Sequence, residues 1–188
     1  LQAKGVAADR ISTDAKGDTV RIAAAQGERK QVYLPDSSSV WLNSGATLTY
    51  VSGFGNIHRN VELKGEAYFD IKRNENLPFF VNVYGITLEV LGTSFNVEAY
   101  QENQNIKVGL FEGRVAINTP KSATTHALRP GELMTIDKQK QEVSRGKYTY
   151  EETFGWKEEI LSFDGITFVE FVEKLQRWYN VTIQVKGK

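Results

Sequence analysis

The clearest structural signal in the chain is the run Phe79-Phe80-Val81-Asn82-Val83-Tyr84-Gly85-Ile86-Thr87-Leu88-Glu89-Val90. Apolar residues occupy alternate positions on both sides of Tyr84-Gly85, which is the period of a strand with one buried face. Gly85 can adopt the positive φ that a tight turn requires. The run therefore predicts a β-hairpin made of two short strands.

The same alternation extends outward from this hairpin, from about Asp18 to Val143. Upstream, it involves Val40, Leu42, Ala46, Leu48 and Tyr50, and then Val61, Leu63, Phe69 and Ile71, with Lys64-Gly65 as a candidate turn. Downstream, it involves Phe95 and Val97, then Ile106, Val108 and Leu110, then Val115 and Ile117, and finally Leu133, Met134 and Ile136. Many short strands with turn signals and no helical period predict a mainly β fold, either an antiparallel β-sandwich or a partly open barrel.

The period changes near the C-terminus. Phe168, Phe171, Val172, Leu175 and Tyr179 follow the spacing of an amphipathic helix. Thr167 and Glu170 form a capping box, and Asn180 is a plausible stop. Ile160 and Phe163 before the helix, and Val181, Ile183 and Val185 after it, suit short strands. The tail is therefore predicted to be a small β-α-β unit. Such a unit leaves open sheet edges, so it must lean on the β region or on something outside this chain.

These changes of period suggest a division into domains. The stretch from Asp137 to Glu152 is rich in charge and weak in periodicity, which favours a boundary there. We expect a flexible N-terminal segment over 1–17, an all-β domain over 18–145, and the start of an incomplete α+β domain over 146–188.

Composition excludes several classes of protein. The chain has 188 residues and a formal net charge of +0, so it lacks the bulk attraction that most nucleic-acid and anionic-membrane binders use. It has no cysteine, which excludes disulfides, thiolate metal sites and cysteine nucleophiles. No apolar run is long enough to span a membrane. Because the chain begins at Leu1, we expect it to be a segment of a longer protein.

Residues that could carry catalysis are few. His58 and His126 are the only histidines, they have no metal-ligand spacing, and we expect both to be solvated loop residues. Ser52-Gly53-Phe54-Gly55 completes neither a nucleophile elbow nor a dinucleotide fingerprint. The pairs Glu151-Glu152 and Glu158-Glu159 are interpreted as a solvated linker. We therefore predict no enzyme activity, no cofactor and no metal.

The tryptophans leave a second function open. Trp41 alternates with Val40 and Leu42, so it faces away from the core that they enter. It could lie on a ligand or partner surface, or pack under a loop or a second sheet. Trp178 borders the apolar face of the predicted helix and suits packing at the edge of a core. Together with Trp156, these residues keep a carbohydrate-binding β-sandwich as the alternative.

Five ordered segments resemble the FecR-type anti-sigma regulators. They are Gln31 to Asn43, which is similar to the LPDGS-x-V-x-LN signature; Arg59 to Phe69; Pro78 to Val81; Leu91 to Val97; and Gly109 to Val115. The likeness spans about Gln31 to Gly131, and Trp156 to Val185 is similar to the start of the small domain that follows in the Bacteroidetes branch. One departure is Ser37, where the family usually has glycine, and a type I turn accepts serine there.

The signature residues also have local structural roles. Pro35 sets φ at the first central position of a turn, Asp36 can cap that turn, and Asn43 can bond its local backbone. These motifs identify a scaffold and carry no catalytic chemistry.

The resemblance implies a periplasmic sensor region at the Gram-negative inner membrane. In that family a TonB-dependent outer-membrane transducer docks through its signalling domain, and a cytoplasmic segment holds an extracytoplasmic-function sigma factor. A membrane helix outside this chain would provide the anchor, and the cargo would be a glycan or a ferric siderophore. From the predicted open edge of the tail, we expect Val181, Ile183 and Val185 to bind the partner. Trp41 is a further candidate.

Overall fold

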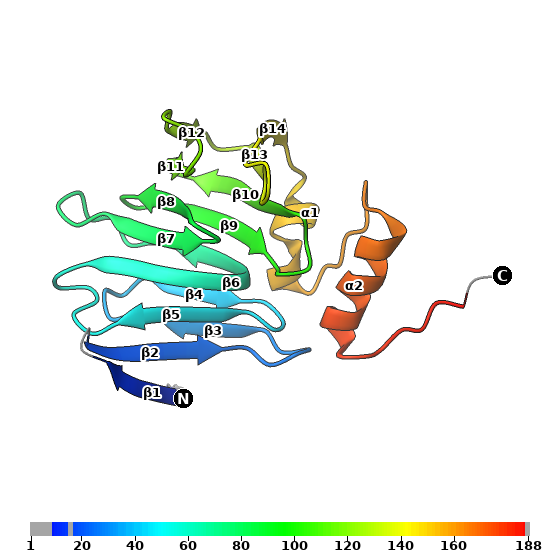
Figure 1. Cartoon of the computed structure of the whole chain (residues 1–188), viewed down its shortest axis with the longest axis horizontal. Coiled ribbons are helices and arrows are strands. Elements are labelled where there is room, and N and C mark those ends of the chain that lie inside the picture. Colours follow the sequence, from blue (N-terminus) through cyan, green and yellow to red (C-terminus); the bar gives the residue numbers. More distant parts are fainter. Residues whose placement is uncertain (1–8, 15–16, 187–188) are drawn as a thin grey trace.

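The computed structural model describes residues 9–14 and 17–186, with side chains from Asp18 onward, and it is mainly β as predicted. The strands curl into an open half-barrel (Figure 1). They are β1 (Asp9–Asp14), β2 (Gly17–Ala23), β3 (Lys30–Tyr33), β4 (Ser39–Leu42), β5 (Thr47–Val51), β6 (Arg59–Asp70), β7 (Phe79–Val83), β8 (Ile86–Val90), β9 (Ser94–Ala99), β10 (Asn105–Glu112), β11 (Val115–Asn118), β12 (His126–Leu128), β13 (Glu132–Asp137) and β14 (Val143–Lys147). The expected flexible segment 1–17 lies outside the described residues except at 9–14 and 17.

The long strand β6 is the spine of the half-barrel. Its first half pairs with β5 and with β7, the latter in the one parallel pairing among the described strands. Its second half pairs with β4 and β9. Gly65 marks the change of partners with φ +92, and a Cβ there would lie 2.8 Å from Ala46 Cα. The turn predicted at Lys64-Gly65 is therefore wrong: glycine bends a continuous strand at this point.

The core fills the concave side of the half-barrel. It is built from the alternating apolar residues that the sequence singled out, among them Val40, Leu48, Phe69, Val81 and Ile106. Phe69 and Phe95 stack with ring centroids 5.0 Å apart. The hairpin β7–β8 is confirmed, and its turn residues Tyr84 and Gly85 both have positive φ.

Two short helices cover part of the outer face. These are α1 (Tyr150–Thr153) and the 3-10 helix η1 (Gly155–Glu158), and Phe154 between them is fully buried. Phe154 packs against Tyr68, Phe111, Tyr148 and Tyr150. The four glutamates of this region are solvent-exposed as predicted, but the region is not a linker, because an aromatic cluster fastens it to the sheet. The expected domain boundary at residue 145 falls inside β14.

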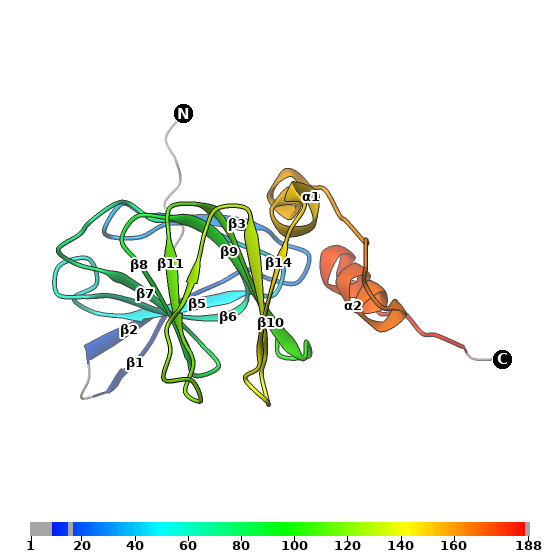
Figure 2. The same ribbon diagram turned by 90° about the horizontal axis from the view of Figure 1, so that it is seen from above.

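The predicted helix is present as α2 (Phe168–Tyr179), with the capping box of Thr167 and Glu170 and a left-handed Asn180 at its end. It lies beside one end of the half-barrel (Figure 2). The strands predicted on either side of it are absent: residues 160–163 and 181–186 are irregular. Alternation places side chains on two faces, but a strand also needs a neighbouring strand to pair with. Neither segment has one within the described residues.

Candidate functional site

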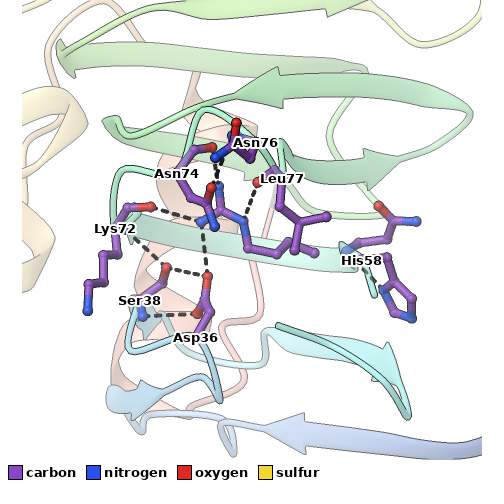
Figure 3. Close-up of polar contacts among 9 residues, drawn as sticks. Asp36, Ser38, His58, Lys72, Asn74, Asn76 and Leu77 are labelled. Carbon is purple, nitrogen blue, oxygen red and sulfur yellow. Dashed lines mark hydrogen bonds and ion pairs between the residues drawn. The ribbon is translucent and has the colours of Figure 1, made fainter. Parts of the chain in front are cut away.

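A buried arginine joins two of the signature segments. Arg59, only 1% exposed, donates from Nη1 to Asp36 Oδ2 at 3.1 Å and to the carbonyl of Lys72 at 2.8 Å (Figure 3). Its Nε donates to the carbonyl of Leu77 at 2.7 Å and its Nη2 to that of Asn74 at 3.3 Å. The guanidinium therefore fastens the loop after β6 to the β3–β4 turn.

The polar groups of the β3–β4 turn also have hydrogen-bond partners within this network. Asp36 accepts from the Ser38 backbone N–H at 3.0 Å and from its hydroxyl at 2.8 Å, so it caps the turn as predicted. The Lys72 backbone N–H donates to Ser38 Oγ at 3.1 Å. His58 lies apart from this group (Figure 3). Because each polar atom is matched to a fixed partner, we interpret the network as a structural clamp.

A second region, around α2, leaves apolar side chains exposed to solvent. The helix is held to the half-barrel by polar contacts. Ser44 Oγ donates to the carbonyl of Arg177 at 2.6 Å, and Arg177 Nη1 lies 2.6 Å from Glu102 Oε1. Two arginine stacks add to these contacts: the Arg177 guanidinium lies 4.0 Å from the Tyr100 ring centroid, and that of Arg29 lies 4.1 Å from that of Trp178.

The apolar stripe of α2 is turned away from these contacts. We use this name for Phe168, Phe171, Val172, Leu175 and Tyr179. Phe168 is 63% exposed and Tyr179 is 62% exposed, whereas Lys174 and Arg177 on the other side of the helix line a cleft against the sheet. Phe163 packs on Phe171 at the border of the stripe, with ring centroids 4.8 Å apart. An amphipathic helix normally buries its apolar side, and here the polar side faces the protein.

Between α2 and the sheet lies a polar cleft of about 300 Å³. Glu66 of β6 lies in its wall and is 8% exposed. Its carboxylate accepts from Asn43 Nδ2 at 2.8 Å and from Asn96 Nδ2 at 2.9 Å. Burial, and then the nearby charge of Glu98, raise the pKa of Glu66 to about 7. The cleft therefore contains a carboxyl group that titrates near neutrality.

The four predicted partner-binding residues fall in two places. Val181 is 49% exposed and Val185 is 60% exposed, and both follow α2 directly. Ile183 is half-buried, and its backbone N–H donates to Gln176 Oε1 at 2.8 Å. Trp41 is half-buried on the outer side of β4, opposite Tyr68 of β6 in register. The three tail residues follow α2 in the chain, and Ile183 contacts the helix through Gln176, whereas Trp41 lies on the sheet.

The other chemical candidates remain scattered. His58 and His126 are half-buried; His58 Nε2 lies 3.3 Å from the carbonyl of Ser52, and His126 begins β12 instead of lying in a loop. In the described part of the chain, no three His, Asp or Glu residues are grouped as metal ligands. None of the helices described is long and apolar enough to cross a membrane.

The tryptophans have separate environments. Trp156 is buried, and its indole N–H donates to Asn96 Oδ1 at 3.1 Å, so it cannot stack on a sugar. Trp178 has the Arg29 guanidinium on its ring. These residues and Trp41 do not form the shared aromatic groove that a glycan site would need.

The Arg59–Asp36 pair and the Glu66 network were not predicted from the sequence. The sequence did contain a signal for the Arg59–Asp36 pair. Arg59 begins strand β6, and every other residue on the same face of that strand is uncharged. No comparable signal identified Glu66, which stands next to Gly65 at the bend of β6. Its two hydrogen-bond partners come from β9 and from the loop after β4.

Comparison with known proteins gives consistent matches. Residues 20–116 match the family model described as FecR protein. Two solved structures from Parabacteroides distasonis ATCC 8503, described as those of a candidate anti-sigma factor, are similar. One is 33% identical with a TM-score of 0.80, and the match covers 86% of this chain and 75% of the other chain. The other is 34% identical with a TM-score of 0.79, and the match covers 85% of this chain and 74% of the other chain. No curated protein matches the chain.

Proposed function

The chain belongs to the FecR family of anti-sigma factors, and on this premise we propose that it is a sensor region that works by docking with a protein partner. The partner is the signalling domain of a TonB-dependent outer-membrane transducer. Docking controls an extracytoplasmic-function sigma factor, which is held by a cytoplasmic segment outside this chain. The described region would then lie on the periplasmic face of the inner membrane.

The observation that supports this proposal best is the apolar stripe of α2. A stable monomer seldom leaves two large aromatic residues of one helix more than half exposed, as Phe168 and Tyr179 are. Val181 and Val185, which follow the helix in the chain, are exposed as well. Phe171, Val172 and Leu175 of the same stripe are half-buried. Exposed aromatic side chains grouped on one side of a helix are typical of a protein interface.

The segment after α2 suggests how the partner binds. Residues 181–185 alternate apolar and polar side chains but pair with no strand in the described structure. An extended segment of the transducer could pair with their backbone and lay its apolar side chains on the stripe. Main-chain hydrogen bonds would then supply affinity, and the pockets between stripe residues would supply specificity.

The test is a calorimetric titration with the purified signalling domain of the proposed TonB-dependent transducer. Phe168→Glu and Val185→Asp each place a charge in the docking surface, and we expect each to weaken binding by about tenfold or more, since each buries an unpaired charge in the complex. Tyr33→Glu is the matched control, because Tyr33 is 72% exposed on β3, away from the stripe. We expect it to bind like the unmodified chain.

Thermal unfolding of each variant separates a loss of docking from a loss of folding. Unchanged affinity in Phe168→Glu and Val185→Asp would place the docking surface elsewhere. Absence of binding by the unmodified chain would refute the choice of partner.

A further inference from the structure

The last turn of α2 carries the polar contacts that join this helix to the half-barrel. In the part of the chain that the structure describes, each hydrogen bond, ion pair and arginine stack between the two bodies involves Arg177 or Trp178. At the other end of the helix, Thr167 and Glu170 bond to each other in the capping box. The helix is therefore fastened to the half-barrel at its C-terminal end.

One of these contacts satisfies a carbonyl group that the helix leaves without a partner. The carbonyl groups in the last turn of a helix accept no hydrogen bond from within the helix. In α2, the carbonyl of Gln176 accepts from the backbone N–H groups of Asn180 and Val181. The carbonyl of Arg177 accepts from the hydroxyl of Ser44, which belongs to the half-barrel, at 2.6 Å. Ser44 thus caps the helix from outside it.

Ser44 is itself fixed in place. It is 1% exposed, and its backbone N–H donates to Asn43 Oδ1 at 2.8 Å. Its Oγ accepts from the Gly27 N–H at 2.7 Å, and its carbonyl accepts from the Tyr100 hydroxyl at 3.1 Å. A Cβ at Gly27 would lie 3.2 Å from Asn180 Cβ, so this loop and the end of α2 approach closely. Because its other polar atoms have partners, the Ser44 hydroxyl has a defined position from which to hold the helix.

The Arg177 side chain provides a second attachment beside the first. It is 14% exposed, its guanidinium lies 4.0 Å from the Tyr100 ring centroid, and its Nη1 lies 2.6 Å from Glu102 Oε1. Tyr100 therefore takes part in both attachments, through its hydroxyl to Ser44 and through its ring to Arg177. The planar guanidinium can stack and form an ion pair at once, which the ammonium group of lysine cannot.

We propose that Ser44, Tyr100 and Glu102 form a receptor for the end of α2, and that this receptor fixes the direction in which the helix presents its apolar stripe. Arg177 is then a positioning residue for docking. The second half of this proposal rests on the proposed function. A helix that is already held in place loses less freedom when a partner binds, so the receptor strengthens docking without itself touching the partner.

The first arm of the test measures distances in the full chain, which has no cysteine of its own. Spin labels are placed at Glu62→Cys, an exposed position of β6, and at Val169→Cys, an exposed position in the first turn of α2. Without a partner, we expect one narrow distance distribution. Ser44→Ala and Arg177→Gln should each broaden it, because each removes one attachment at the end where the helix is held. Arg145→Gln, which removes an exposed arginine of β14, is the matched control and should leave it narrow.

The second arm measures affinity for the transducer's signalling domain by calorimetry. Ser44→Ala and Arg177→Gln should each weaken binding by about threefold to tenfold, because the helix must then be ordered when the partner binds. Ser44 is 1% exposed, so its effect cannot come from a lost contact with the partner. Phe168→Glu should weaken binding and yet leave the distance distribution narrow, since Phe168 belongs to the docking surface and not to the receptor.

The two arms fail in different ways. A distribution that stays narrow in both Ser44→Ala and Arg177→Gln overturns the receptor, and if Ser44→Ala does not fold, Arg177→Gln decides alone. Broadened distributions with unchanged affinity overturn the role of the receptor in docking. Absence of binding by the unmodified chain refutes the proposed function and that role with it, whereas the distance measurement still decides whether the receptor exists.

Discussion

Ser37 occupies a backbone conformation that suits glycine. Its φ is +66, and its backbone N–H donates to the carbonyl of Leu34 at 2.9 Å, so it is the last residue of a turn with Pro35 first in the centre. The placement of Pro35 is thus confirmed. The turn accepts serine here as predicted, but at a cost, because a left-handed residue with a Cβ costs about 1–2 kcal/mol. The glycine usual at this position in the family has a physical reason.

Replacing Ser37 with glycine should therefore stabilise the protein. We expect Ser37→Gly to raise the free energy of unfolding by about 0.5–1 kcal/mol, after the greater flexibility of glycine in the unfolded chain is subtracted. Urea denaturation gives the measurement. Ser39→Gly, the same change within β4, should destabilise the protein, and a loss of stability in Ser37→Gly would contradict the strain argument.

The Arg59 clamp predicts a large effect from one side chain. In Arg59→Met, the carboxylate of Asp36 and three backbone carbonyls lose a buried donor, and we expect unfolding to become about 3–5 kcal/mol easier. Asp36→Asn keeps an acceptor beside Arg59, so it should cost less. Chemical denaturation of both variants tests this order, and a loss below about 1 kcal/mol in Arg59→Met would show that the clamp is not structural.

At the scale of elements, α1 provides the clearest case of tight packing on the outer face. A Cβ at Gly109 of β10 would overlap Thr153 Cγ2 of α1. Gly109→Ala should therefore cost about 1–3 kcal/mol. Thr153→Ser removes that methyl group, so the same alanine should cost much less in the Thr153→Ser background. Thermal unfolding of the unmodified chain, both single variants and the double variant gives the interaction energy between positions 109 and 153. If the stability losses of the two single variants simply add in the double variant, Thr153 of α1 does not pack against position 109.

Some secondary-structure elements were predicted correctly from the sequence, and others were not. The hairpin at Tyr84-Gly85 and the capped helix α2 were predicted because their signals are local: alternation, a turn glycine, a capping box. The strands expected around Ile160 and Ile183 were not found, because pairing depends on a second strand. The packing of Phe154 was missed because its partners, such as Tyr68, come from distant strands.

The whole molecule divides into a half-barrel with a dense core and an attached helix. The hydrophobic core draws on residues from Ile22 to Ile136 and includes none from α2. The sequence could predict this body because each strand carries its own pattern. It could not predict the orientation of α2, because a helical pattern shows which side is apolar but not whether that side meets the sheet.

This division predicts that the half-barrel is stable alone. Deleting residues 160–188 removes α2 and its polar contacts but no residue of the core cluster. The one ion pair removed, Arg177–Glu102, is partly exposed and at the edge of the half-barrel, where such pairs contribute about 1 kcal/mol. The truncated chain should therefore still unfold cooperatively, within a few degrees of the full chain. Calorimetry provides the test, and a molten truncated chain would show that α2 is integral to the fold.

The most direct test of the docking account is NMR mapping of the isotope-labelled chain during titration with the transducer's signalling domain. The account predicts that amide shifts and line broadening concentrate at residues 163–185, around the apolar stripe. Perturbations confined to the outer face around Trp41 and Tyr33, with α2 unaffected, would contradict it.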